Sequence, residues 1–289
     1  MKLKHLELKD IIRTALVEDI GSGDVTSKAI VPKGARAKAK IASKGFGIIA
    51  GMDVVKLAFE MVDKKVKVKV KVKDGARAYP GRTLATIAGP AQSILAAERT
   101  ALNFLQRMSG IATTTRAFVK KTRFYKAKIM ATRKTAPGLR GLDKYAVVIG
   151  GGLPHRMGLY DAVLIKENHI AVARGMKKTI SLARRNAPPM MGIEVEVKTL
   201  QEVREAIEEG ANTILLDNMN ILVLRRAVRL VKKHNDRLGV PQANIKTEAS
   251  GGITLRNVAR IARAGVDFIS VGALTHSPRA VDVSLVITR

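Results

Sequence analysis

Residues 130–170 read MATRKTAPGLRGLDKYAVVIGGGLPHRMGLYDAVLIKENHI, and their pattern recurs through the second half of the chain. Short apolar runs near 128–132 and 162–165 are followed at once by cations, first Arg133 with Lys134 and then Lys166. Apolar runs of this length become buried strands, and residues just past a strand lie in the loops that carry function. The stretch therefore predicts strand ends that gather positive charge around a ligand with several negative charges.

The same alternation continues to the end of the chain. Further apolar strands are expected at 193–197, 213–216, 245–248 and 268–271, and amphipathic helices at 139–148, 172–185, 200–208, 221–234 and 254–264. Repeated strand–helix units imply a parallel sheet. A polar residue or a glycine follows every strand, which favours a barrel, because a β/α barrel builds its site from all these loops whereas an open sheet uses one crevice. We predict an incomplete β/α barrel of about six strands.

The first part of the chain has a different pattern. Residues 35–43 and 65–73 alternate basic with small or apolar side chains, and 82–88 reads as another strand. Helices are expected at 11–18 and 53–61, and a long helix at 91–108 is expected to break at Ser109-Gly110 before a further helix at 112–125. We predict an N-terminal α/β sandwich with antiparallel strands over residues 1–110. The barrel follows over 111–289, with its last residues able to pack back on the first domain.

Composition excludes several classes of protein. At 289 residues and 46% hydrophobic content the chain is globular and long enough for one or two domains. The absence of cysteine excludes disulfides, thiolate chemistry and cysteine-based zinc sites, and it suits a reducing cytoplasm. No run of 18 apolar residues occurs, and the N-terminus has no apolar stretch of signal-peptide length. We therefore expect a cytoplasmic protein without a membrane partner.

The formal charge of +28 arises from 52 basic and 24 acidic residues. Such an excess suggests a polyanionic partner or the steering of phosphorylated substrates. The segment 65–73 reads KVKVKVKVK, which is typical of a half-buried strand with a solvated lysine face, although a nucleic-acid surface is an alternative. With 3% aromatic residues and no tryptophan, the chain has few rings on which bases could stack.

Three kinds of polar group follow the expected barrel strands. The first kind is cationic, and an arginine there can hold a carboxylate with two parallel hydrogen bonds; its members are Arg133, Lys134, His155, Arg156 and Lys166. The second is acidic: Glu196 and Asp217, with Glu194 on the same strand face as Glu196. These carboxylates indicate either an interior salt bridge to a lysine or a Mg²⁺ site that also stabilises developing positive charge.

The third kind is a pair of glycine loops after the last two strands. They are Ser250-Gly251-Gly252-Ile253-Thr254 and Val271-Gly272-Ala273-Leu274-Thr275-His276. Glycine lets backbone N–H groups approach a phosphate, and the helix expected to start near Thr254 would present its positive end. Tight turns without a ligand are the alternative. Phosphate sites after the final strands recur in β/α barrels, so the loops favour a phosphorylated ligand.

Taken in order, the motifs of the chain resemble the quinolinate phosphoribosyltransferase family. The resemblance runs from about residue 10 to 285 and is carried by Glu18-Asp19, Gly23-Asp24-Val25-Thr26, Glu98-Arg99-Thr100-Ala101-Leu102-Asn103-Phe104, Ser109-Gly110-Ile111-Ala112-Thr113, Thr132-Arg133-Lys134-Thr135, His155-Arg156 with Gly158-Leu159, Lys166 with Asn168-His169, Glu194-Val195-Glu196-Val197, Leu216-Asp217-Asn218, Ser250-Gly251-Gly252 and Val271-Gly272-Ala273-Leu274-Thr275. It departs at Pro154, where many members carry Asn, which affects the loop before His155.

The resemblance implies a Mg²⁺-dependent enzyme that joins quinolinate to phosphoribosyl pyrophosphate and releases pyrophosphate and CO₂. It implies that quinolinate is held by Arg99, Arg133, His155, Arg156 and Lys166. It implies catalytic roles for Lys134, Glu196 and Asp217, with Mg²⁺ bound by the two carboxylates through water. Phosphoribosyl pyrophosphate would contact those three residues and the loop residues Ser250, Gly251, Gly252, Gly272 and His276.

The family also implies a homodimer or a hexamer in which Arg99 reaches the neighbouring subunit's site. On spacing alone, Arg99 beside Glu98 indicates an ordinary surface ion pair, so the resemblance reverses that interpretation. Two alternative functions stay open. One is a relative of the same fold that uses another base, such as nicotinate. The other is a basic nucleic-acid binder without enzymatic activity. The phosphoribosyltransferase, by contrast, is expected to have no nucleic-acid partner.

Overall fold

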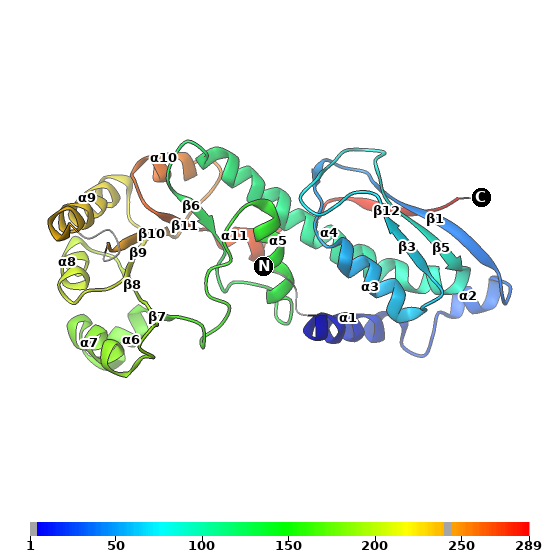
Figure 1. The fold of residues 1–289 in the computed structure, drawn as a ribbon, viewed down its shortest axis with the longest axis horizontal. Coiled ribbons are helices and arrows are strands. Elements are labelled where there is room, and N and C mark those ends of the chain that lie inside the picture. The colour runs from blue at the N-terminus through cyan, green and yellow to red at the C-terminus, as the bar shows by residue number, and fades with distance from the viewer. Residues whose placement is uncertain (1–4, 240–243, 289) are drawn as a thin grey trace. The chain divides into compact units, whose positions relative to one another are not determined.

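The protein is described by a computed structural model for residues 5–239 and 244–288, and it divides into two units (Figure 1). The first unit comprises residues 1–116, 135–151 and 274–289. The second comprises 117–134 and 152–273. The contacts of segments 135–151 and 274–289 thus group them with the N-terminal part of the chain, although both segments follow barrel strands in the sequence.

The first unit is built on an antiparallel sheet with the strand order β12-β1-β5-β3. Its strands are β1 (Arg36–Ser43), β3 (Lys67–Val70), β5 (Thr83–Pro90) and β12 (Val283–Thr288), and a separate pair is formed by β2 (Gly47–Ile48) and β4 (Arg77–Ala78). Along β1, Ala39 and Ile41 are buried whereas Lys38 is exposed, as expected for alternation. Of the segment 65–73 only 67–70 is strand, with Lys67 and Lys69 exposed.

Helices α1 (His5–Ile20), α2 (Val25–Ile30), α3 (Met52–Val62), α5 (Arg140–Gly150) and most of α4 (Ala91–Thr122) complete this unit. The expected break at Ser109-Gly110 is wrong, because α4 runs through it. A Cβ at Gly110 would lie 2.0 Å from the carbonyl oxygen of Arg279, so this glycine permits a close approach between segments. The Ser109 hydroxyl accepts the Ala50 N–H at 3.1 Å.

An ion pair between a partly buried arginine and a fully buried aspartate joins three parts of the first unit. Arg107 on α4 donates two hydrogen bonds to Asp143 on α5, at 2.9 and 2.8 Å, and a third to the Thr275 carbonyl at 3.2 Å. Asp143 is fully buried and also accepts the Ala136 N–H at 3.2 Å. A bidentate pair of this kind fixes geometry as well as charge. It therefore holds segments 135–151 and 274–289 against α4.

The second unit is a parallel sheet of six strands in the order β6-β11-β10-β9-β8-β7. They are β6 (Lys128–Met130), β7 (Val163–Ile165), β8 (Ile193–Val197), β9 (Thr213–Asp217), β10 (Lys246–Ser250) and β11 (Phe268–Ser270). No ladder joins β6 to β7 within residues 5–239 and 244–288, so the barrel is not closed. The predicted fold class, an α/β sandwich followed by an incomplete six-stranded barrel, is confirmed.

Helices form an outer arc around these strands (Figure 1). They are α6 (Glu167–Ala173), α7 (Met176–Asn186), α8 (Leu200–Glu208), α9 (Ile221–Leu238) and α10 (Val258–Arg263), whereas the short α11 (Ala273–His276) belongs to the first unit from Leu274 onward. The single helix expected at 172–185 is wrong, because Arg174 and Gly175 have φ of 60° and 127° and separate α6 from α7. The helix expected from 254 begins only at Val258.

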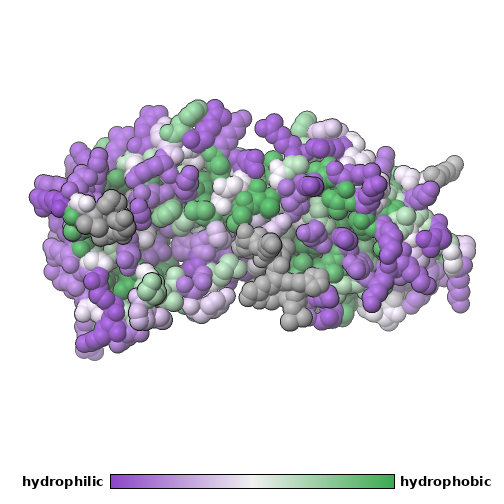
Figure 2. Space-filling view, in the orientation of Figure 1, coloured by the Kyte–Doolittle hydropathy of each residue, from purple (hydrophilic) through white to green (hydrophobic). Residues whose placement is uncertain are grey.

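The surface of the second unit follows from its helix patterns. The amphipathic helices α8 and α9 bury Val203, Ala206, Leu224, Ala227 and Val231. Hydrophilic side chains cover much of the outer face that these helices present (Figure 2). Within the described residues, no helix is long and apolar enough to cross a membrane.

Candidate active site

The C-terminal strand ends of the second unit carry most of the predicted site residues. These are Arg133, Lys134, His155, Arg156, Lys166, Glu196, Asp217, Ser250, Gly251, Gly252 and Gly272. Because β7, β8, β9 and β10 are successive neighbours in a parallel sheet, the residues at their ends lie along one edge. The contacts below show which of them meet.

Lys166 and Glu196 form an ion pair across two neighbouring strands. Lys166 Nζ lies 2.6 Å from Glu196 Oε2, and the Lys166 loop is ordered by His169, whose Nδ1 accepts the Lys166 N–H at 2.9 Å. Lys198, which pairs with Glu167, carries an electrostatic interaction with both Glu196 and Asp217. The salt bridge expected as one interpretation of Glu196 is therefore present, and a ligand that uses Glu196 must share it with Lys166.

Asp217, Asn218 and Gly251 form the corner between β9 and β10. Asn218 donates its N–H to the Ser250 carbonyl at 2.9 Å and its side-chain amide to Asp217 Oδ2 at 3.1 Å. Gly251 has φ of +87°, and a Cβ there would lie 2.2 Å from Asn218 Oδ1. Glycine is therefore required at 251 both by its backbone angle and by the approach of Asn218.

The loop after β10 is closed by side-chain hydrogen bonds. Asn257 accepts the Thr254 N–H at 2.8 Å and donates to the Gly252 carbonyl at 2.8 Å. Gly252 also has a left-handed φ, of +59°. Because α10 starts four residues after Thr254, the loop rather than a helix end presents the backbone near Gly251 and Gly252.

Two guanidinium groups lie close enough to repel each other. Burial, together with the positive charge of Arg133, lowers the pKa of Arg156 below its usual value. Arg156 is 8% exposed and donates to the Ala162 carbonyl at 2.9 Å. Arg133 Nε is buried and has no hydrogen-bond partner among the described residues. An anion with two charged groups would offset the repulsion between the two arginines and could accept a hydrogen bond from Arg133 Nε.

His155 contacts two buried carboxyl groups. Its Nε2 lies 3.5 Å from Glu194 Oε2 on β8 and 3.5 Å from Glu248 Oε2 on β10. Its Nδ1 accepts the Arg156 N–H at 2.6 Å, which assigns the ring proton to Nε2. Both ring nitrogens are thus directed at the protein in this structure.

Glu248 is a residue that the sequence analysis missed. It is 1% exposed, and its Oε1, like that of Glu194, has no partner within the part of the chain that the structure describes. A carboxylate inside a buried strand is itself a signal, since glutamate is almost never fully buried without a partner. Burial, followed by the charge of Glu248 and a hydrogen bond to it, raises the pKa of Glu194 to about 9.

Comparison with known proteins decides the family. The N-terminal domain of quinolinate phosphoribosyl transferase, as a family model, matches residues 24–109, and its C-terminal domain matches residues 111–286. The chain belongs to this family. The two family domains meet near residue 110. The two units defined by contacts are divided differently, because segments 135–151 and 274–289 belong to the first unit.

Family relatives align over nearly the whole chain. A probable carboxylating nicotinate-nucleotide pyrophosphorylase of Bacillus subtilis is 43% identical, covering 99% of this chain and 95% of that protein. The chloroplastic carboxylating enzyme of Arabidopsis thaliana is 44% identical, with 97% and 83% covered. NadC from Streptococcus pyogenes superimposes with a TM-score of 0.91 at 36% identity, covering 100% of both chains. The resemblance seen in the sequence is therefore confirmed.

The donor set at β8 and β9 suits the Mg²⁺ that the family implies. Glu196 and Asp217 offer hard carboxylate oxygens at neighbouring strand ends, and Mg²⁺ commonly takes one or two carboxylates with water and substrate phosphate. Among the described residues, the group whose ligand atoms lie close enough to enclose a metal by themselves is instead His155 with Glu194 and Glu248. The Mg²⁺ assignment to Glu196 and Asp217 stays a proposal.

Two predicted residues of the family site belong to the first unit. Arg99 is exposed on α4, and His276 is exposed in α11, where its Nδ1 lies 2.6 Å from the Ser277 hydroxyl. Their contributions to quinolinate and phosphate binding stay predictions.

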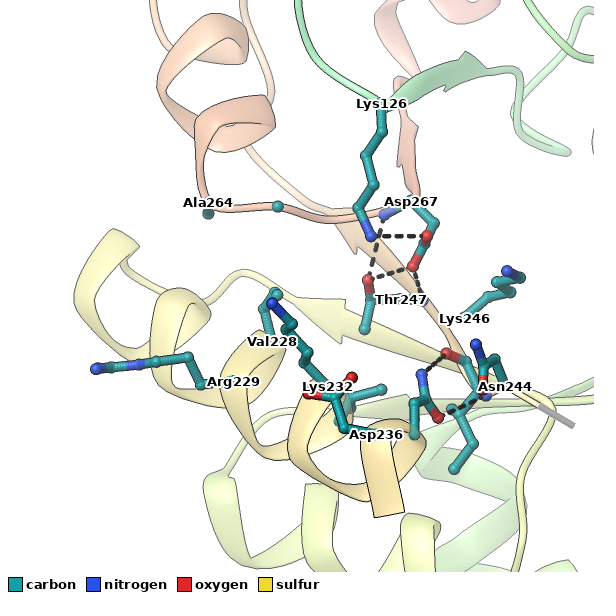
Figure 3. Close-up of a pocket in the computed structure, with 14 residues that line it drawn as sticks. Lys126, Val228, Arg229, Lys232, Asp236, Asn244, Lys246, Thr247, Ala264 and Asp267 are labelled. Carbon is teal, nitrogen blue, oxygen red and sulfur yellow. Dashed lines mark hydrogen bonds and ion pairs between the residues drawn. The ribbon is translucent and has the colours of Figure 1, made fainter. Parts of the chain in front are cut away.

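A cavity of about 570 Å³ lies at the other ends of the strands (Figure 3). Its lining includes Asp267, which accepts hydrogen bonds from Lys126 and from the backbone and hydroxyl of Thr247 at 2.8–2.9 Å. None of the predicted site residues lines it. Lys246 and Thr247 begin β10, whereas Ser250 ends it, so this cavity is separate from the candidate site.

Proposed function

We propose that this member of the quinolinate phosphoribosyltransferase family transfers the phosphoribosyl group of phosphoribosyl pyrophosphate to quinolinate. The reaction releases pyrophosphate and CO₂ and gives nicotinate mononucleotide. The observation that carries the proposal is the pair Arg133 and Arg156, whose guanidinium groups are partly or fully buried and repel each other. In addition, Arg133 Nε has no hydrogen-bond partner among the described residues. Two carboxylates on one ring match such a pair better than a single carboxylate does.

The bond-forming step needs positive charge to be stabilised at the ribose. The pyridine nitrogen forms a bond to the anomeric carbon while the bond from that carbon to pyrophosphate oxygen breaks. The transition state is cation-like, and the carboxylates of Glu196 and Asp217, at adjacent strand ends, would stabilise it. No covalent enzyme intermediate is required.

The leaving group is anionic and needs donors. Backbone N–H groups of the loops at Gly251, Gly252 and Gly272 and the hydroxyl of Ser250 would hold phosphate oxygens. Lys134, exposed beside Arg133, would lie between the two substrates and add positive charge. Bound Mg²⁺ would supply further charge to the departing pyrophosphate.

Loss of CO₂ follows from the chemistry of the ring. The bond between ring carbon 2 and its carboxylate breaks, and the electron pair stays on carbon 2, where the quaternised nitrogen stabilises it. A proton then adds to that carbon. Arg133 and Arg156 keep the ring in place, while no group of the chain has to form a bond to it.

Assembly and location are part of the proposal. Arg99, exposed on α4, would enter the site of a second subunit in a homodimer or a hexamer, as the family resemblance implies. We place the enzyme in the cytoplasm, because a chain without cysteine suits a reducing compartment.

The test is product formation from quinolinate, phosphoribosyl pyrophosphate and Mg²⁺, with nicotinate as the control base. We expect nicotinate mononucleotide from quinolinate only, and loss of activity in Arg133→Ala because one carboxylate loses its partner. Product from nicotinate alone would instead indicate a relative of the same fold that uses a base with one carboxylate.

A further inference from the structure

The carboxyl group of Glu248 is buried deep in the second unit and takes part in none of the steps above. It projects from β10 and is 1% exposed, and Glu194 from β8 contacts the same imidazole. One strand, β9, lies between β8 and β10 in the sheet. Two glutamates from different strands that face one imidazole form a built arrangement, because a buried carboxyl group without partners would be costly.

The imidazole that the two glutamates face belongs to His155, whose backbone is strained. His155 has φ of 53°, a left-handed conformation that is uncommon outside glycine even though His, like Asn and Asp, adopts it more often than other residues, and that costs about 1–3 kcal/mol. Such a conformation persists when its surroundings hold it. Here the ring is held at both ends, by the two glutamates at Nε2 and by the Arg156 N–H at Nδ1.

The next residue along the chain is one of the two substrate arginines. Arg156 receives its backbone position from His155 and its side-chain direction from the Ala162 carbonyl. A shift of His155 would therefore move the guanidinium of Arg156 relative to that of Arg133. Displacements of about 1 Å in a binding site can cost about a hundredfold in rate.

We propose that Glu248 is a positioning residue, which acts through His155 to aim Arg156 at the second carboxylate of the pyridine substrate. The inference rests on the proposed function. On this proposal, His155 contributes by holding the loop that carries Arg156. The preference for a dicarboxylate over a monocarboxylate then depends on Glu248, which contacts neither carboxylate of the substrate.

The test compares Glu248→Gln with a matched control, Asp267→Asn. Asp267 is a partly buried carboxylate just before β11, hydrogen-bonded to Thr247 next to Glu248, but it lies at the opposite strand ends. We expect Glu248→Gln to raise the KM for quinolinate by about ten- to a hundredfold, with little change in the KM for phosphoribosyl pyrophosphate. Asp267→Asn should leave both KM values unchanged.

A second measurement does not depend on turnover. The chain has 5 histidines, so imidazole nitrogen spectra are simple enough to assign. Wild type should show His155 with its proton on Nε2, and Glu248→Gln should shift those resonances. The variant His155→Asn, whose side chain tolerates a left-handed backbone and can donate to the carboxyl groups, should retain a lower quinolinate KM than His155→Ala.

Several outcomes would overturn the inference. If Glu248→Gln changed both KM values equally, or lowered only the melting temperature, Glu248 would be structural alone. Tight binding of Zn²⁺ by wild type, lost in Glu248→Gln, would make the cluster a metal site instead. Absence of quinolinate turnover in wild type would defeat the proposed function, whereas turnover with an unaltered Glu248→Gln would defeat this inference only.

Discussion

Two left-handed residues other than glycine lie in loops of the candidate site. Apart from Arg174, which ends α6, His155 and Asn218 are the described residues other than glycine with positive φ. Each is held by a partner on another strand: His155 by Glu194 and Glu248, and Asn218 by the Ser250 carbonyl. Strain of this kind, retained at a site, indicates that the loop conformation is preorganised rather than formed on binding.

The carboxyl group of Glu194 predicts a pH dependence of stability. Its pKa is raised to about 9 in the folded chain, mainly by burial and then by Glu248, against an ordinary value of 4.5. Between these values the folded state binds more protons than the unfolded state, so the free energy of unfolding falls as the pH rises. The slope for one group approaches 1.4 kcal/mol per pH unit, as an order of magnitude.

Glu194→Gln keeps a hydrogen-bonding group but cannot ionise. We expect denaturant unfolding of this variant, measured from pH 5 to 9, to lose the part of the decline that wild type shows. A variant that declines as steeply as wild type would mean that Glu194 is ionised in the folded chain at neutral pH.

Gly251 predicts a separation of stability from phosphate binding. Alanine at 251 must adopt φ of +87° and displace Asn218, whereas alanine at Gly75 must adopt almost the same φ, +86°, with no atom within 4 Å. Gly75→Ala should cost about 1–2 kcal/mol of stability, and Gly251→Ala should cost about 1–3 kcal/mol more because Asn218 must move. Only Gly251→Ala should also raise the KM for phosphoribosyl pyrophosphate, and an equal rise in Gly75→Ala would contradict a role for this loop.

At this scale the sequence predicted residue types better than their partners. The sequence places Lys166 and Glu196 at strand ends and offers a salt bridge to a lysine as one interpretation of Glu196, but it does not indicate that Lys166 is the partner. Glu248 was missed because its strand, Lys246–Ser250, is mostly polar, so that one more polar residue does not stand out, and only the pairing of β8, β9 and β10 brings it to Glu194 and His155. Long-range pairing of this kind is not encoded in local spacing.

Glycine inside a helix shows how an element can be misread. Ser109-Gly110 has the composition of a helix break, yet α4 continues through it because the missing Cβ lets the chain at Arg279 approach. Conversely, the helical spacing over 172–185 hid the left-handed pair Arg174 and Gly175 that ends α6. Strand positions were predicted well, since buried parallel strands are continuous apolar runs, whereas helix ends depend on contacts that lie far away in sequence.

Two helical glycines provide a matched test of this reading. Gly110→Ala places a Cβ 2.0 Å from a backbone oxygen, while Gly141→Ala, in α5, meets no atom within 4 Å. We expect Gly110→Ala to destabilise the protein by about 1–3 kcal/mol. Gly141→Ala should be neutral or stabilise it by up to about 1 kcal/mol, because alanine favours helix.

The measurement is the free energy of unfolding in urea. If Gly110→Ala were as stable as Gly141→Ala, the close approach of α4 to Arg279 would not hold in solution, and the glycine would need another explanation.

At the scale of the whole molecule, chain order and spatial grouping differ. A sequence boundary near residue 110 separates two patterns, and the family domains follow it, but segments 135–151 and 274–289 group with the first unit. Arg107 and Asp143 explain part of this, since they tie α4, α5 and the Thr275 segment together. The strand β12, which pairs with β1, explains the rest; the sequence allowed its last residues to pack on the first domain but did not indicate β1 as the partner strand.

The net charge of +28 exceeds what one anionic site needs. Lys38, Lys67 and Lys69 lie exposed on the outer side of the first unit's sheet, which agrees with a solvated face. Nothing in the fold requires them for chemistry, and the structure offers no physical account of the full excess.

The proposed donation of Arg99 predicts activity in a mixture of two inactive variants. Arg99→Ala and Arg133→Ala should each be inactive, because each removes a guanidinium from every site. If Arg99 enters the partner subunit's site, a mixed dimer contains one site with both lesions and one intact site. By the symmetry of a random mixture, activity should recover to about a quarter of the wild-type value.

The control is a mixture of Arg133→Ala with Lys166→Ala, two residues of the same unit, which should not recover because every site carries one lesion or the other. Subunit exchange must be verified by mass spectrometry of tagged chains. Mixed dimers without recovered activity would mean that Arg99 serves the site of its own chain, and the ordinary ion pair with Glu98 would again be the simplest reading of that helix.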